Sequence, residues 1–93
     1  MIRSFRDRLT RAVFEGESPK GFPADVVKVA RRKLRYLHAA SDLNDLKSPP
    51  ANRLEALKHD RAGQHSIRVN DKWRICFVWT LDGPTEVEIV DYH

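Results

Sequence analysis

The chain has 93 residues, of which 41% are hydrophobic and 32% are charged, with a formal net charge of +4. This length fits a single domain over residues 1–93 with one hydrophobic core, and excludes a multidomain protein. No apolar run reaches the roughly 18 residues of a transmembrane helix, and the first residues lack the apolar core of a signal peptide. We therefore expect a cytoplasmic protein without membrane contact. The single cysteine, Cys76, excludes an internal disulfide and is expected to pack in the core.

The first elements expected are a short edge strand at residues 1–5 and a helix that follows it. Phe5, Leu9 and Val13 recur every four residues, which is the spacing of one helix face. The cluster of Gly, Ser and Pro at residues 15–21 interrupts this pattern and predicts a loop.

A second helix is predicted from Pro23, a residue favoured in the first helical turn, to about Ala40. Its core-facing stripe comprises Val27, Ala30, Leu34 and Leu37. The simplest packing of the two helices is antiparallel. The basic residues at 31–35 lie mostly off this stripe, which is typical of a solvated face, although an anionic partner such as nucleic acid or an acidic protein would also be attracted to them.

After Ser48-Pro49-Pro50, the apolar period changes from helical to two, which predicts strands. Four strands are expected, at residues 54–56, 65–69, 73–80 and 85–90. The third is apolar on nearly both faces and should be central. Its residues Trp73, Ile75, Phe77 and Trp79 share one face, and Arg74, Cys76 and Val78 share the other. The sequence predicts an α+β fold with two N-terminal helices packed on one face of an antiparallel sheet.

Three polar groups, Asp91, Tyr92 and His93, follow the last predicted strand directly. Pairing within a sheet fixes the position of a strand end, so we expect these three groups to have a fixed position as well. Histidine titrates near neutral pH and suits proton transfer. The alternative is a loose chain end. The other histidines, His38, His59 and His65, show no metal-ligand spacing.

Four motifs are spread over nearly the whole chain. They are Met-Ile-x-Ser-Phe at the start, Leu-x-x-Leu-Lys-x-Asp-Arg-x-Gly at residues 54–63, Ser-Ile-x-Val-x-x-x-Trp-Arg-Ile-x-Phe at residues 66–77, and the closing Asp-Tyr-His. Together they resemble the HigB group of the RelE/ParE superfamily of bacterial toxins. The resemblance implies a RelE-like microbial RNase fold and a ribosome-dependent messenger RNA endonuclease with a metal-free site and no cofactor.

The same resemblance implies the partners of the protein. These are the ribosome with its RNA, messenger RNA, and a HigA-type helix-turn-helix antitoxin that neutralises the toxin. Operator DNA would be bound only through the toxin–antitoxin complex.

One position departs from the HigB pattern. HigB relatives carry His just before the Ala/Pro-Leu-Lys motif, whereas this chain has Glu55. Glu-x-Leu-Lys-His, followed by a strand Arg and a C-terminal His, resembles the YoeB branch of the superfamily, in which Glu is the base and His the acid. The resemblance thus implies Glu55 as general base and His93 as general acid, with Arg74 and Lys58 stabilising charge in the transition state.

Further roles are assigned to neighbouring polar residues. Tyr92 would stack on a base or orient a phosphate, and Asp91 would orient a cation. The residues expected to contact RNA are Lys58, Arg61, Arg68 and Lys72.

Glu55 and the function of the chain each have an alternative interpretation. Glu55 fits a solvated strand carboxylate as well as a base. Two other functions fit the chain: a ParE-like toxin that acts on DNA gyrase without a catalytic site, and a basic RNA-binding module without catalysis. The set of acid, base and cationic groups argues against the ParE-like function, since a protein that only binds has no use for them. The RNA-binding module stays open, and it predicts that growth arrest does not depend on His93.

Overall fold

The computed structural model describes residues 1–91, which form an α+β fold. Two α-helices, α1 (Arg8–Phe14) and α2 (Ala24–Ala39), precede the sheet. The strands are β1 (Glu55–Ala56), β2 (His65–Arg68), β3 (Trp73–Thr80) and β4 (Gly83–Asp91). Three short 3-10 helices connect the elements: η1 (Leu43–Lys47), η2 (Pro50–Asn52) and η3 (His59–Arg61). The predicted fold class is confirmed, but the 3-10 helices were not foreseen, because one helical turn is too short to show a period.

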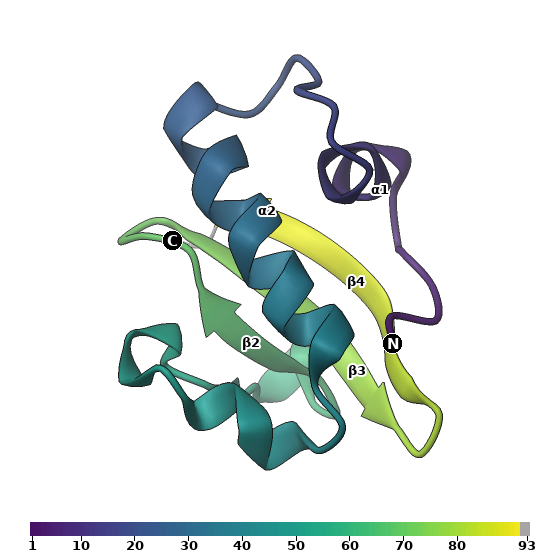
Figure 1. The fold of residues 1–93 in the computed structure, drawn as a ribbon. Coiled ribbons are helices and arrows are strands. Elements are labelled where there is room, and N and C mark those ends of the chain that lie inside the picture. The colour runs from purple at the N-terminus through teal and green to yellow at the C-terminus, as the bar shows by residue number, and fades with distance from the viewer. Residues whose placement is uncertain (92–93) are drawn as a thin grey trace.

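The sheet is an antiparallel meander in the order β1-β2-β3-β4, and α2 crosses one of its faces (Figure 1). The central position predicted for β3 is correct. The expected antiparallel helix pair is wrong, because Figure 1 shows α1 end-on while α2 runs across the view. The reason is that α1 is tied to the sheet as well: the buried Thr10 hydroxyl accepts a hydrogen bond from the Ile89 N–H of β4 at 3.0 Å.

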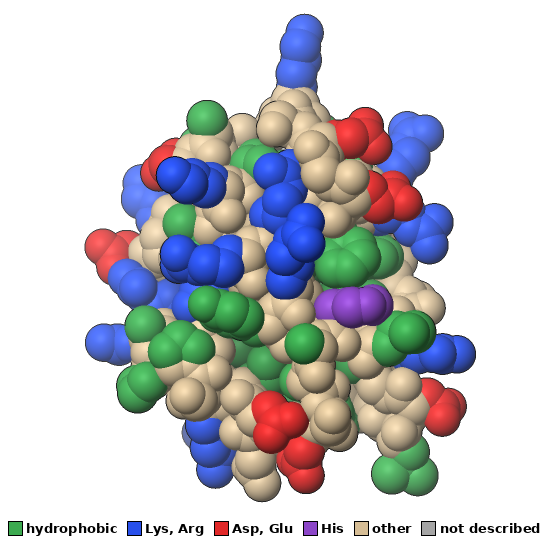
Figure 2. All heavy atoms as spheres, viewed as in Figure 1, with side chains coloured by type: hydrophobic (Ala, Val, Ile, Leu, Met, Phe, Trp, Pro, Cys, Tyr) green, Lys and Arg blue, Asp and Glu red, His purple; other side chains and the backbone are tan. Residues whose placement is uncertain are grey.

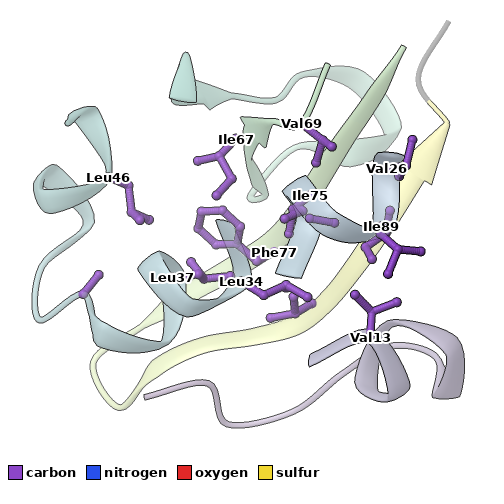
Figure 3. Packing of buried hydrophobic residues seen from close by; sticks show 14 residues of the cluster. Val13, Val26, Leu34, Leu37, Leu46, Ile67, Val69, Ile75, Phe77 and Ile89 are labelled. Atoms are coloured by element: carbon purple, nitrogen blue, oxygen red, sulfur yellow. The ribbon is translucent and has the colours of Figure 1, made fainter. Parts of the chain in front are cut away.

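The core lies between α2 and the sheet (Figure 3). The predicted stripe of α2 is buried, namely Val27, Ala30, Leu34 and Leu37. It packs against Ile67, Ile75 and Phe77 of the sheet, all fully buried. Leu9, predicted on the buried face of α1, is instead 44% exposed, and Thr10 lies inward with Val13.

A bulge in β4 decides which of its side chains face the core. Cys76 pairs with Glu88 and Val78 pairs with Thr85, so a single residue of β3 lies opposite two residues of β4. Glu86, within the bulge, has a φ of 52°, and its N–H donates to Ser4 Oγ at 3.0 Å. The extra residue changes the alternation, so that Glu88 faces away from the core.

The N-terminal segment follows the outer edge of β4. Phe5 makes an isolated parallel bridge to Val87, and the Arg3 N–H donates to the Pro84 carbonyl at 2.8 Å. The predicted edge strand at residues 1–5 is therefore reduced to one bridge, because the bulge interrupts the row of β4 groups that a longer strand would need.

No helix within residues 1–91 combines the length and the apolar character that a membrane span requires.

Candidate functional site

The sheet face opposite α2, called here the outer face, carries the candidate site. Glu55 of β1 pairs with Ser66 of β2, Ser66 pairs with Cys76 of β3, and Cys76 pairs with Glu88 of β4. Directly opposed residues share a face of a sheet, so this row crosses all four strands. Arg74 is two residues before Cys76 and lies on the same face.

Arg74 is held in place by protein acceptors. Its Nε donates to Ser66 Oγ at 2.7 Å, and its Nη2 donates to the Arg53 carbonyl at 2.6 Å. A longer contact of 3.5 Å joins Nη2 to the Ser66 carbonyl. The side chain is only 11% exposed. Because a guanidinium is planar, these contacts fix its orientation, and Nη1 makes no hydrogen bond to any residue from 1 to 91.

Glu55 lies beside this fixed cation. Its Oε2 is 3.8 Å from Arg74 Nη2, and the side chain is 55% exposed. A carboxylate open to solvent next to a guanidinium has the components for accepting a proton close to a bound phosphate. The structure thus brings together two of the predicted catalytic residues. The exposure of Glu55 also fits a solvated carboxylate, so its role stays a prediction.

The predicted RNA-binding residues fall into two groups. Arg68 pairs across strands with Arg74, lies on the outer face, and forms an ion pair with Asp71. Lys58 and Lys72 are exposed at the ends of the sheet elements, in the connection after β1 and in the β2–β3 turn. Of these three cations, Arg68 is the one that strand pairing places beside Arg74.

Arg61 has a different setting. From η3 it donates to Glu88 Oε1 at 2.9 Å and to Gln64 Oε1 at 3.1 Å. Arg6 approaches the same carboxylate, with its Nε 3.8 Å from Glu88 Oε2. Arg61 is therefore part of an ion-paired cluster on the outer face.

Cys76 is fully buried on the outer side of β3. Burial raises the pKa of the Cys76 thiol, and the Glu88 carboxylate acts in the same direction against the opposing Arg61 and Arg74 cations. A thiol that stays protonated is a poor nucleophile. Cys76 therefore acts as a packing residue, as the sequence predicted.

Of the C-terminal tripeptide, Asp91 lies within the described residues. Asp91 pairs with Trp73 and therefore shares its sheet face. Trp73 and Arg74 are successive residues of β3 and point to opposite faces, so Asp91 lies on the face opposite Arg74. The structure does not bring Asp91 onto the outer face. Tyr92 and His93 lie outside the described residues. Within residues 1–91, no cluster of three His, Cys, Asp or Glu side chains is suited to a metal ion.

The opposite side of the molecule, formed by α2, carries a basic surface made of Lys28, Arg32 and Arg35, all exposed. Figure 2 shows Lys and Arg side chains gathered over this helix. Two of the predicted basic residues do not belong to it. Arg31 donates from Nε to the Val13 carbonyl at 2.8 Å, and Lys33 is buried with its Nζ bonded to Asn52 Oδ1.

Comparison with known proteins shows the family of the chain. A family profile described as RelE-like toxin of type II toxin-antitoxin system HigB matches residues 3–93. Toxin HigB-1 of Vibrio cholerae is 34% identical over 94 residues, spanning 100% of this chain and 98% of its own. Endoribonuclease HigB of Proteus vulgaris is 31% identical over 93 residues, spanning 100% of both chains. An uncharacterised protein of Haemophilus influenzae is 39% identical over 71 residues, 76% of this chain and 70% of its own.

The fold and these matches define a RelE-like toxin of a type II toxin–antitoxin system. Within that class, the chain belongs to the HigB family. The resemblance seen in the sequence motifs is thereby confirmed.

Proposed function

We propose that this toxin is a metal-independent, ribosome-dependent endoribonuclease that cuts messenger RNA through attack of the 2′-hydroxyl on the neighbouring phosphate. The observation that carries the proposal is the Glu55–Arg74 pair on the outer face, with 3.8 Å between Oε2 and Nη2. The name of the Proteus vulgaris relative, an endoribonuclease, supports RNA as the substrate.

The proposed reaction uses side chains as acid and base. The 2′-oxygen attacks phosphorus while Glu55 takes its proton, and the bond from phosphorus to the 5′-oxygen breaks. His93 donates a proton to the leaving 5′-oxygen, which gives a 2′,3′-cyclic phosphate and a 5′-hydroxyl. Arg74 and Lys58 stabilise the charge that develops on the phosphate oxygens. Each positioned acid or base contributes about 10²–10⁴-fold in rate.

The remaining predicted residues take supporting roles. Tyr92 is proposed to stack on a base. Asp91, on the sheet face opposite Arg74, is proposed to orient a cation at the end of β4. Arg61, Arg68 and Lys72 are proposed to contact the RNA backbone, with Arg61 doing so from within its ion-paired cluster.

Dependence on the ribosome follows from the small number of reactive groups. A site with few groups needs its substrate held in an attack-ready geometry, and the ribosome supplies a fixed message. The ribosome as partner also implies a cytoplasmic location.

Primer extension on a message in a purified translation reaction tests this function. We expect cuts within translated codons when toxin and ribosomes are both present. Efficient cutting of naked message at equimolar toxin would contradict the dependence on ribosomes. Intact message in both reactions would contradict nuclease activity and favour the ParE-like or RNA-binding alternative.

The partner is proposed to be a HigA-type helix-turn-helix antitoxin that binds the side of the molecule formed by α2 and the loop at residues 15–21. The exposed cations Arg32 and Arg35 on α2 support an acidic partner surface there. The bound antitoxin would make the toxin too large to enter the ribosome, and the Glu55–Arg74 pair would stay uncovered. Operator DNA would be reached only through the antitoxin.

A further inference from the structure

We propose that Ser66 is a positioning residue, which holds the Arg74 guanidinium in the orientation that the cleavage reaction needs. The inference rests on the function proposed above. Ser66 is fully buried in β2, between Glu55 of β1 and Cys76 of β3. Its Oγ accepts the hydrogen bond from Arg74 Nε at 2.7 Å.

The hydrogen bonds of Arg74 determine which edge of the guanidinium remains for substrate. Arginine has five N–H donors in a rigid plane. Ser66 uses the donor on Nε, and the Arg53 carbonyl uses a donor on Nη2 at 2.6 Å. Nη1 bonds to no residue from 1 to 91, and we assign its N–H donors to a phosphate oxygen of the substrate.

The second anchor of Arg74 is the carbonyl of Arg53, and the neighbouring Asn52 side chain holds this stretch of backbone in place. Asn52 is fully buried, and its Nδ2 donates to the Leu46 carbonyl at 3.1 Å and to the Ser48 carbonyl at 3.3 Å. Arg53 follows with a φ of 45°, a left-handed turn that sets the direction of its carbonyl. Because this anchor is a backbone group, substitution of Ser66 removes one anchor and leaves the other.

Loss of the Ser66 hydroxyl would leave a nearly buried N–H without its acceptor. The guanidinium would then be held only through its Nη2 contacts, about which it can turn. A misplaced cation stabilises the transition state less. Binding of the toxin to the ribosome is spread over a large surface, so the substitution should leave that binding unchanged. The expected signature is a lower maximal rate at an unchanged half-saturating concentration of ribosomes.

The test is single-turnover cleavage on ribosomes programmed with a defined message. Ser66→Ala should lower the maximal rate by about 10- to 100-fold, the value of a hydrogen bond to a charged group. Ser66→Thr, which keeps the hydroxyl, should recover most of the rate. Thr80→Val is the matched control: it removes a hydroxyl that donates to the Gly83 carbonyl at 2.7 Å at the far end of β3, and should keep the wild-type rate. Ser66→Cys, similar in size but a weak acceptor, replaces the alanine variant if that variant does not fold.

An independent readout is the Arg74 Nε–H resonance of the free toxin in nitrogen-15 NMR. Its hydrogen exchange should be slow in wild type and Ser66→Thr, and faster in Ser66→Ala. A wild-type rate with an unchanged Nε–H signal in Ser66→Ala would overturn the assignment, as would an equal rate loss in Thr80→Val. Wild-type toxin that fails to cut would refute the proposed nuclease function instead, and the NMR comparison would still decide whether Ser66 holds Arg74.

Discussion

Cys76 shows how the surroundings of one residue remove its reactivity. It is fully buried, and burial raises the pKa of its thiol. We expect the native protein to react with a thiol reagent at least about tenfold more slowly than the unfolded chain, because the thiolate is the reactive form and is both rare and shielded. Absorbance of the released chromophore, with and without urea, measures both rates. Equal rates would show that the Cys76 site is open.

Lys33 is a second residue whose chemistry depends on burial. It is 4% exposed, and burial lowers its pKa below the ordinary value of 10.5, with the Arg32 and Arg68 cations acting in the same direction. The unfolded chain keeps the ordinary pKa, so between the two values it binds more protons than the native protein. The contribution of Lys33 to the free energy of unfolding therefore rises with pH in that window.

The prediction for Lys33 concerns a comparison with Lys33→Met. The free energy of unfolding of wild type should increase relative to this variant as pH rises toward 10.5. Urea denaturation of both proteins at a series of alkaline pH values measures the difference. A difference that stays constant up to pH 10 would mean that Lys33 has no lowered pKa.

At the scale of elements, Arg31 joins the two helices. Its Nε donates to the Val13 carbonyl near the end of α1 at 2.8 Å, and its Nη2 donates to the Glu17 carbonyl in the loop. Arg31→Ala should lower the free energy of unfolding by about 1–3 kcal/mol, because it removes the two hydrogen bonds that this charged donor makes to the Val13 and Glu17 carbonyls. The neighbouring exposed Arg32→Ala should change it by no more than about 0.5 kcal/mol. Equal effects in urea denaturation would contradict a structural role for Arg31.

The type and order of the main elements could be predicted from the sequence, because apolar periods of 3.6 and 2 are distinct. The bulge at Glu86 could not, since its backbone N–H bonds to Ser4, 82 positions away in the chain. The burial of Lys33 could have been predicted from its position on α2. It lies three residues after Ala30 and one before Leu34, which is the spacing of the buried stripe.

The contacts within the site could not be predicted because the pairing register of β2 and β3 is not evident from the sequence. The alternation of β3 correctly placed Arg74 and Cys76 on one face, and the same reasoning would have placed Ser66 with Arg68 on β2. The contact from Ser66 to Arg74 needs the exact pairing of the two strands, which the turn between them sets. The alternation therefore predicts which of these residues share the outer face, but not how Arg74 is held.

The whole molecule has two sides with different proposed partners. The outer face carries the Glu55–Arg74 pair, and the α2 side carries exposed Arg32 and Arg35. Reversing both charges, Arg32→Glu with Arg35→Glu, should weaken antitoxin binding at least about tenfold while cleavage of message continues, because like charges at an interface repel. Calorimetric titration with the antitoxin measures the first effect. The control is Lys47→Glu, an exposed cation outside α2; equal weakening by the control would refute this binding surface.

The central claim is that Glu55 accepts the proton of the attacking hydroxyl on the ribosome. Single-turnover cleavage of a defined message on programmed ribosomes, compared for wild type, Glu55→Gln, Glu55→Ala and Glu55→His, tests it most directly. Glu55→Gln keeps the shape but not the basicity, and should lower the rate by about 10²–10⁴-fold with ribosome binding intact. Glu55→His should retain more activity than Glu55→Ala, because imidazole is again a base. A wild-type rate for Glu55→Gln would contradict the account and show that Glu55 is a solvated strand carboxylate.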